Sequence, residues 1–134
     1  MDLIKLTNVI KNIDERGYLI EFLRDDENML DFKGQIYVSL FEPYTKRGDH
    51  YHKKRYEIFS VIKGELVLHT LNLDTEKKHK IELSSENDYL QRIMIPPMTA
   101  HTFVNSSQKS ILISYTNLVY DKSNTDTYKY NISI

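Results

Sequence analysis

The chain has 134 residues, which fits a single domain that is large enough to bury a core without covalent cross-links. It contains no cysteine, which excludes disulfides and thiolate zinc sites, and its formal net charge of -1 argues against a nucleic-acid partner. No apolar run approaches the roughly 20 residues that span a bilayer, and the first residues lack the apolar stretch of a signal peptide. We therefore expect a cytoplasmic protein that binds neither nucleic acid nor membrane.

Short apolar or alternating runs follow one another along the chain and predict strands. In chain order these runs are Leu3–Leu6, Tyr18–Leu23, Gln35–Phe41, Glu57–Ile62, Glu65–Leu73, Lys78–Leu83, Arg92–Ile95, Thr102–Val104 and Ile111–Leu118. Turn signals such as Lys63-Gly64 and Pro96-Pro97 separate them, and only Asp25–Asp31 predicts a helix, of one or two turns. Many short strands at close spacing predict an all-β sandwich or closed barrel that forms one domain over residues 1–134.

Three histidines and one glutamate form the pattern that says most about chemistry. His50 and His52 are two residues apart, so in a strand their side chains point to the same face. Glu57 follows after a basic stretch, and His101 follows a rigid proline turn far downstream. Three imidazoles and a carboxylate suit a divalent ion such as zinc, nickel, iron or manganese. The four residues therefore predict a metal site with one open coordination position.

Two segments of the chain resemble the two sequence motifs of the cupin family. The matching residues are Gly48, His50, His52, Glu57 and Gly64 in the first motif, and Pro97, His101 and Asn105 in the second. Met98 stands where the second motif usually has a glycine. The resemblance implies a small double-stranded β-helix, that is, a jelly-roll barrel with all four ligand positions filled. It also implies a homodimer, because cupins of this size often pair through sheet edges.

Further segments resemble nucleotide-sugar epimerases and ketoisomerases. The segments similar to dTDP-4-keto-rhamnose 3,5-epimerases are Asp14–Glu21, Lys46–His52, Leu83–Asn87, Ile95–Phe103 and Ser114–Asp121. The stretch from His50 to Lys54 is similar to sugar 3,4-ketoisomerases, and Asp126-Thr127-Tyr128 is similar to the end of the cupin domain in capsule-biosynthesis UDP-sugar reductases. The resemblance implies an isomerase of deoxysugar or surface polysaccharide biosynthesis.

The reaction that this resemblance implies is proton transfer next to the keto group of a nucleotide-linked 4-keto-6-deoxy sugar. Such a reaction needs a base that takes the proton, a donor or cation that holds the enolate, and an acid that returns the proton. The resemblance implies His50 as the base and Tyr115 as the acid. It implies Arg47 and Tyr120 as contacts to the substrate, and the planar guanidinium of an arginine suits phosphate oxygens.

Two versions of the site stay open, because a metal-bound His50 cannot also abstract a proton. In the first version a divalent ion is bound by His50, His52, Glu57 and His101 and acts as a Lewis acid. In the second version no metal binds, His50 and His52 act as base and shuttle, and Glu57 orients a histidine. The alternative functions are a metal-dependent cupin enzyme of another class, such as a dioxygenase or lyase, and a non-catalytic module that binds a sugar or metabolite.

Overall fold

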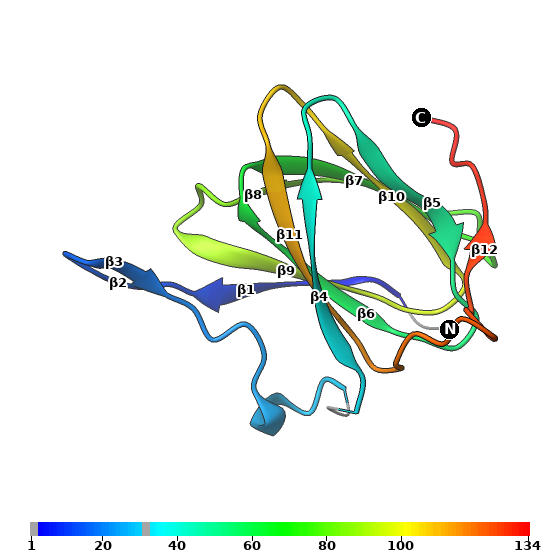
Figure 1. The fold of residues 1–134 in the computed structure, drawn as a ribbon, viewed down its shortest axis with the longest axis horizontal. Coiled ribbons are helices and arrows are strands. Elements are labelled where there is room, and N and C mark those ends of the chain that lie inside the picture. Colours follow the sequence, from blue (N-terminus) through cyan, green and yellow to red (C-terminus); the bar gives the residue numbers. More distant parts are fainter. Residues whose placement is uncertain (1–2, 31–32) are drawn as a thin grey trace.

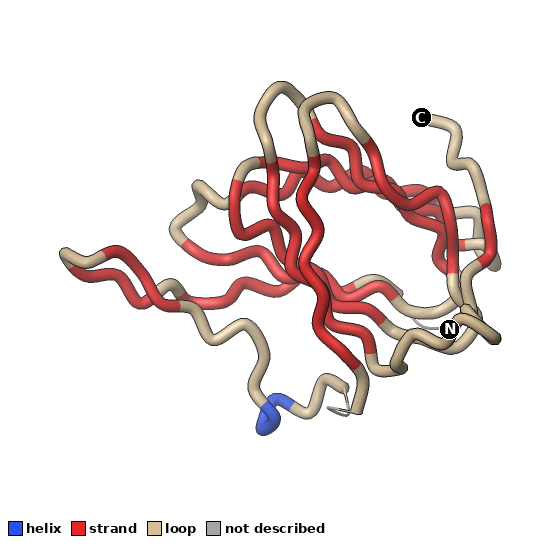
Figure 2. Tube along the Cα trace, in the orientation of Figure 1, coloured by secondary structure: helices blue, strands red, loops and turns tan. Residues whose placement is uncertain are grey.

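The computed structural model describes residues 3–30 and 33–134, and strands dominate it (Figures 1 and 2). The strands are β1 (Lys5–Ile10), β2 (Asn12–Asp14), β3 (Gly17–Leu19), β4 (Gln35–Phe41), β5 (Lys46–Tyr51), β6 (Glu57–Lys63), β7 (Glu65–Asn72), β8 (Lys78–Ser84), β9 (Tyr89–Ile95), β10 (Thr99–Asn105), β11 (Ser110–Thr116) and β12 (Tyr128–Lys129). One 3-10 turn, Asp25–Glu27, is the only helical element of the described residues. Within the same residues no helix is long and apolar enough to cross a membrane.

Two five-stranded antiparallel sheets face one another and form the barrel (Figure 1). The strand orders are β1-β9-β6-β11-β4 in one sheet and β12-β5-β10-β7-β8 in the other. Strands far apart in the sequence become neighbours in this arrangement, as β5 and β10 do. The small hairpin β2–β3 projects from the barrel (Figure 1). The predicted all-β, cupin-like barrel is confirmed.

The hydrophobic core lies between the two sheets, because alternate residues of each strand point inward. Its buried members are Phe41, Phe59, Val61, Leu66, Leu68, Leu83, Ile93, Ile95, Phe103 and Leu112. The ring of Phe103 meets those of Phe41 and Phe59 edge-on, with centroids 6.4 and 5.0 Å apart. Burial of each such side chain contributes on the order of 2 kcal/mol. These three rings also form the floor of the cavity described below.

The apolar runs locate most strands but not all of their boundaries. Tyr18–Leu23 predicts a longer strand than β3, and Thr102–Val104 covers only the middle of β10. β5 is absent from the predicted strands because its sequence Lys46–Tyr51 is almost entirely polar. It becomes a strand because β10 and β12 pair with it on its two sides.

The predicted helix over Asp25–Asp31 is reduced in the structure to the single 3-10 turn Asp25–Glu27. Residue Asp31 lies outside the described residues. Arg92, a buried residue of β9, holds this turn against the sheet. Its guanidinium donates to the Glu27 carboxylate at 2.6 and 3.0 Å and to the carbonyl oxygen of Phe22 at 2.8 Å. The turn is therefore held both by Arg92 and by its own cap, in which the Arg24 N–H donates to Glu27 Oε1 at 2.8 Å.

Candidate metal and catalytic site

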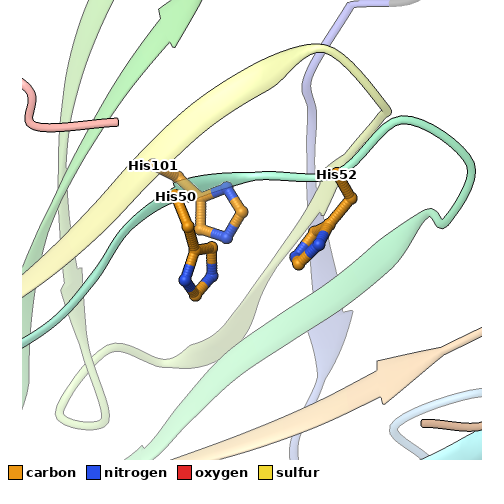
Figure 3. A group of neighbouring side chains, drawn as sticks. All are labelled: His50, His52 and His101. Carbon is orange, nitrogen blue, oxygen red and sulfur yellow. The ribbon is translucent and has the colours of Figure 1, made fainter. Parts of the chain in front are cut away.

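The three histidines of the predicted site meet where β5 lies beside β10 (Figure 3). His50 and His101 pair across the two strands, and their ring centroids are 4.9 Å apart. His52 follows the end of β5, with its ring centroid 5.0 Å from that of His50 and 5.6 Å from that of His101. One nitrogen from each ring lies within 4.8 Å of the other two. The structure thus brings together residues that are about fifty positions apart in the chain.

Gly48 permits this close approach of β5 to β10. It has φ +120°, and a Cβ at this position would lie 2.5 Å from the carbonyl oxygen of His101. The register between the strands also shifts between His101 and Thr102. A glycine in the first cupin-like motif is therefore required here by backbone contact, because any side chain would push His50 away from His101.

Glu57, at the start of β6, is buried beneath the histidines and only 2% exposed. Its Oε1 lies 2.8 Å from His52 Nε2 and 3.4 Å from His101 Nε2. The hydroxyl of Tyr37 donates to Oε2 at 2.8 Å. Burial by itself would raise the pKa of Glu57, but the contacts with His101 and His52 outweigh it and hold the pKa below its usual range. Glu57 is therefore a carboxylate at neutral pH.

Backbone carbonyls determine which nitrogens of His52 and His101 face Glu57. His52 Nδ1 donates to the carbonyl oxygen of Asp126 at 2.7 Å, and His101 Nδ1 donates to that of Thr99 at 3.0 Å. Because a carbonyl only accepts, both Nδ1 atoms carry a proton and both Nε2 atoms turn to the site. Hydrogen bonds of this kind, from the ring nitrogen that does not face the ion, orient the histidine ligands of metal sites.

The donor set at Glu57 fits a divalent cation. His52 Nε2 and Glu57 Oε1 are both buried, and neither has a partner in hydrogen-bond geometry among the described residues. Two imidazole nitrogens and one carboxylate oxygen therefore converge without completing a hydrogen-bond network. Unsatisfied buried polar atoms are costly, and a metal ion would satisfy them together. His50 lies close enough to contribute a further nitrogen.

His50 differs from the other two histidines, because within residues 3–30 and 33–134 its ring makes no hydrogen bond. It lines a cavity of about 390 Å³. The other lining residues are Tyr37, Ser39, Phe41, Arg47, Gly48, Phe59, His101, Phe103 and Leu112. Burial, together with the charges of His101 and His52, lowers the pKa of His50 to about 4. The imidazole is therefore neutral at pH 7 and has a lone pair available.

Arg47 and Tyr37 give the wall of this cavity its polar character. Arg47 is exposed, and its guanidinium carbon lies 5.7 Å from the centroid of the Phe41 ring. Tyr37 comes from β4, where its phenol points inward together with Ser39. Burial, with the neighbouring Glu57 charge, raises the pKa of Tyr37 above its usual range. Tyr37 is thus a neutral hydrogen-bond donor at the cavity wall.

The structure does not bring Tyr115 and Tyr120 to this cavity. Tyr115 pairs with Ile36 on the outer face of its sheet, whereas its neighbour Ser114 pairs with Tyr37 on the inner face. Tyr115 lines a separate depression together with Phe22, Leu23 and Ile113. Tyr120 follows β11, is 48% exposed, and donates its backbone N–H to Gln35 Oε1 at 3.0 Å. The alternation of side chains along β11 is the reason for the placement of Tyr115.

Two residues at the site are missing from the sequence-based prediction. Tyr37 has a signal in the sequence, because it alternates with the apolar residues Ile36 and Val38 in a predicted strand. That pattern leaves open which face is inward. Asp126 has no local signal, since its contact with His52 spans 74 positions of the chain.

The barrel and its histidine–glutamate set define a cupin. The sequence profile of the family described as "Polysaccharide biosynthesis C-terminal domain" matches residues 12–128, and the chain belongs to that family.

Two curated relatives match most of the chain. The chain is 29% identical to the spore coat polysaccharide biosynthesis protein SpsL of Bacillus subtilis, over 94% of this chain and 86% of that protein. It is 28% identical to the UDP-2-acetamido-2,6-beta-L-arabino-hexul-4-ose reductase of Pseudomonas aeruginosa, over 86% of this chain but only 29% of the reductase. The chain therefore corresponds to a minor part of the reductase.

Solved structures with the same fold include a capsule protein and sugar isomerases. The capsular polysaccharide assembling protein CapF of Staphylococcus aureus has a TM-score of 0.70 and 25% identity, over 92% of this chain and 34% of CapF. A dTDP sugar isomerase from Desulfovibrio desulfuricans has a TM-score of 0.83 and 17% identity, over 94% of this chain and 82% of that chain. The sugar 3,4-ketoisomerase QdtA from Thermoanaerobacterium thermosaccharolyticum has a TM-score of 0.78 and 18% identity, over 94% and 87%. The chain spans about a third of CapF but most of the two isomerases.

Proposed function

We propose that this protein is an isomerase, an epimerase or ketoisomerase that acts on a nucleotide-linked 4-keto-6-deoxy sugar. One observation carries the proposal: the neutral imidazole of His50 lines an open cavity next to a carboxylate–histidine cluster. The C–H bonds beside a keto group are acidic, and a base positioned at such a bond is the main requirement of the reaction. The names of SpsL and the sugar isomerases support a role in polysaccharide or deoxysugar biosynthesis.

In this proposal His50 accepts the proton, because its pKa near 4 keeps it unprotonated at neutral pH. Arg47, at the cavity wall, holds diphosphate or sugar oxygens through its planar guanidinium. Tyr37 is the phenol that faces the substrate, and it takes the place expected of Tyr115 as proton donor to the enolate. The apolar floor under these groups excludes water from the reacting carbon.

A divalent ion, with zinc as the first candidate, would be held by His52, His101 and Glu57, with His50 near enough to join. When bound, the ion supplies Lewis-acid stabilisation for a keto oxygen. A metal ion bound by His50 would occupy the lone pair of the nitrogen that accepts the proton. The metal-ligand and base roles of His50 are therefore mutually exclusive. Comparing the zinc-loaded and the chelator-treated protein therefore tests both versions of the site.

The experiment is proton NMR in heavy water with dTDP- and UDP-linked 4-keto-6-deoxyhexose. We expect deuterium to enter at C3 or C5, and the labelled carbon identifies the reaction. The variant His50→Gln should lose exchange at least a hundredfold, whereas His79→Gln, an exposed histidine of β8, should retain it. Absence of exchange with both nucleotides, with and without zinc, overturns the proposal and favours another class of metal cupin or a binding module.

The resemblance to small cupins also predicts a homodimer, and β4 offers a surface for it. β4 is an edge strand whose outward residues Ile36, Val38 and Leu40 are exposed. On the adjacent β11 they pair with Tyr115, which is buried, and with Ile113 and Ile111, which are half-buried, so the exposed part of this apolar face lies on β4. Exposed apolar faces of this kind mark interaction sites. We propose that a second copy of the chain covers this face.

A further inference from the structure

Asp126 is a buried carboxylate that lies far from the site in sequence but against it in space. Only 8% of it is exposed. Oδ1 accepts the backbone N–H of Lys53 at 2.9 Å, and Oδ2 accepts those of Lys54 at 3.0 Å and Arg55 at 3.1 Å. One side chain thus satisfies three successive donors of the turn that connects His52 to Glu57.

The main chain of Asp126 contacts the site directly. Its carbonyl oxygen accepts the hydrogen bond from His52 Nδ1 at 2.7 Å. The residue has φ 50°, so its backbone is left-handed, which turns this carbonyl and the carboxylate toward the same turn. Because Nδ1 is held by this hydrogen bond, Nε2 is the ring nitrogen that faces Glu57 Oε1, at 2.8 Å.

The neighbouring C-terminal residues hold Asp126 in this position. Arg55 donates to the carbonyl oxygen of Thr125 at 2.7 Å, β12 pairs with β5, and Tyr130 N–H donates to the Asp49 carbonyl at 2.8 Å. Ile132 is buried against Leu71 and Ala100. The segment is therefore anchored on both sides of Asp126, and the position of its carbonyl is determined by tertiary contacts.

We propose that Asp126 is a positioning residue that fixes the tautomer and the orientation of His52, so that the C-terminal segment forms part of the site. The carboxylate orders the turn 53–55. The carbonyl oxygen of the same residue accepts a hydrogen bond from His52 Nδ1 and so keeps a proton on that nitrogen. The contribution of this residue to turnover rests on the proposed function, but its effect on His52 does not. Loss of a residue that holds the hydrogen bond of a ligating histidine typically lowers metal affinity 10- to 100-fold.

The test compares Asp126→Ala, Asp126→Asn and the control Asp121→Asn, whose carboxylate is exposed in the same segment. Asparagine keeps one acceptor oxygen and tolerates the left-handed backbone, so it separates a weakened contact from a misfolded chain. Two readouts are used: ¹⁵N–¹H NMR of the His52 ring in the metal-free protein, and calorimetric titration with zinc chloride.

In the wild type we expect a His52 Nδ1–H that exchanges slowly with water, because the ring is buried. Asp126→Ala should lose this protected proton and bind zinc 10- to 100-fold more weakly. Asp126→Asn should lie between the two, and Asp121→Asn should stay within twofold of the wild type. If folded Asp126→Ala keeps the protected Nδ1–H of the wild type, the inference is overturned, whatever its zinc response. The ring proton decides the outcome even if zinc does not bind or no sugar is turned over.

Discussion

Tyr37 and Tyr115 lie on neighbouring strands but on opposite faces of the same sheet. Tyr37 points into the barrel and donates to Glu57, whereas Tyr115 is packed on the outer face. Chemically the two phenols are equivalent. At the scale of single residues, the face of the sheet therefore decides which tyrosine can reach a substrate.

Tyr37→Phe removes the hydroxyl that donates to Glu57 Oε2 and leaves this buried oxygen without that donor. We expect the free energy of unfolding to fall by about 1–3 kcal/mol, the usual cost of an unsatisfied buried polar group. Deuterium exchange into a 4-keto sugar should fall at least tenfold. Urea unfolding and the NMR assay measure the two effects.

Tyr115→Phe is the matched control for this substitution, because it removes the same hydroxyl from the outer face. Exchange by this variant should stay within twofold of the wild type. If Tyr115→Phe abolished exchange and Tyr37→Phe did not, Tyr115 would be the acid after all, and the cavity described here would not be the reaction site.

Local elements of this fold depend on contacts made by distant residues. The 3-10 turn Asp25–Glu27 is held by Arg92 of β9, and the turn between His52 and Glu57 is held by Asp126. Both contacts are made by buried charged side chains. Loss of either charge therefore affects a whole turn rather than one side chain.

The Arg92–Glu27 pair predicts how stability depends on pH. The hydrogen bond from Arg92 holds the pKa of Glu27 below its ordinary value of 4.5. A carboxyl with a lower pKa in the folded state stabilises fully above its unfolded pKa, and this stabilisation is lost as the pH falls through the folded pKa. Glu27→Gln should therefore cost about 2 kcal/mol at pH 7, and its difference from the wild type should shrink toward pH 3.

Urea unfolding of both proteins at pH 7 and pH 3 measures this effect. The control is Asp26→Asn, whose carboxylate pairs with Arg24 at the surface. Exposed ion pairs contribute little, so its unfolding midpoint at pH 7 should match the wild type. An equal gap between Glu27→Gln and the wild type at both pH values would contradict the assignment.

Met98 provides a prediction at the turn between β9 and β10. It occupies the position where the cupin motif usually has glycine, and its φ is 63°. A left-handed backbone costs a residue with a Cβ roughly 1–2 kcal/mol, and glycine avoids this cost. Part of the gain is offset because glycine loses more conformational entropy when the chain folds. Met98→Gly should therefore raise the free energy of unfolding by about 0.5–1 kcal/mol.

Equilibrium urea denaturation of Met98→Gly, with Met98→Ala as the comparison, tests this expectation. Alanine removes the same side-chain contacts but keeps the left-handed cost, so it should be less stable than both the wild type and the glycine variant. Equal midpoints for the glycine and alanine variants would show that the backbone strain is not the deciding factor.

At the scale of the whole molecule, the outer side of the edge strand β4, with Ile36, Val38 and Leu40, is an apolar surface that the described part of the chain leaves exposed. Val38 at its centre is 62% exposed. Single exposed apolar residues are ordinary, but a row of them along an edge strand indicates a partner. A dimer would also protect the unpaired edge of β4 from non-specific strand pairing.

Sedimentation velocity should therefore show twice the mass of the chain, and Val38→Lys should shift the protein to the monomer. Lys80→Ala, at an exposed lysine of β8 in the other sheet, is the control and should remain dimeric. A wild-type protein that sediments as a monomer at micromolar concentration would contradict the prediction. A dimer that is unaffected by Val38→Lys would place the interface elsewhere.

The barrel class and the proximity of His50 and His52 could be predicted because both depend on patterns that are local in the sequence, whereas His101 was placed beside them by its resemblance to the second cupin motif. Alternation of apolar residues marks strands such as Gln35–Phe41. The two-residue spacing of His50 and His52 places their rings close together in the structure. β5 could not be predicted, because its polar sequence becomes a strand only between two neighbours.

By itself the sequence determined that this protein is an all-β cupin with three imidazoles and a carboxylate available to one site. Only the tertiary structure decided which phenol faces the cavity and that Glu57 contacts His52 and His101. It also decided that Asp126 holds the turn between His52 and Glu57. The physical reason is the range of the interactions. Propensity and alternation act over a few residues, whereas the inward face of a strand and a contact across 74 positions depend on how the sheets close around the core.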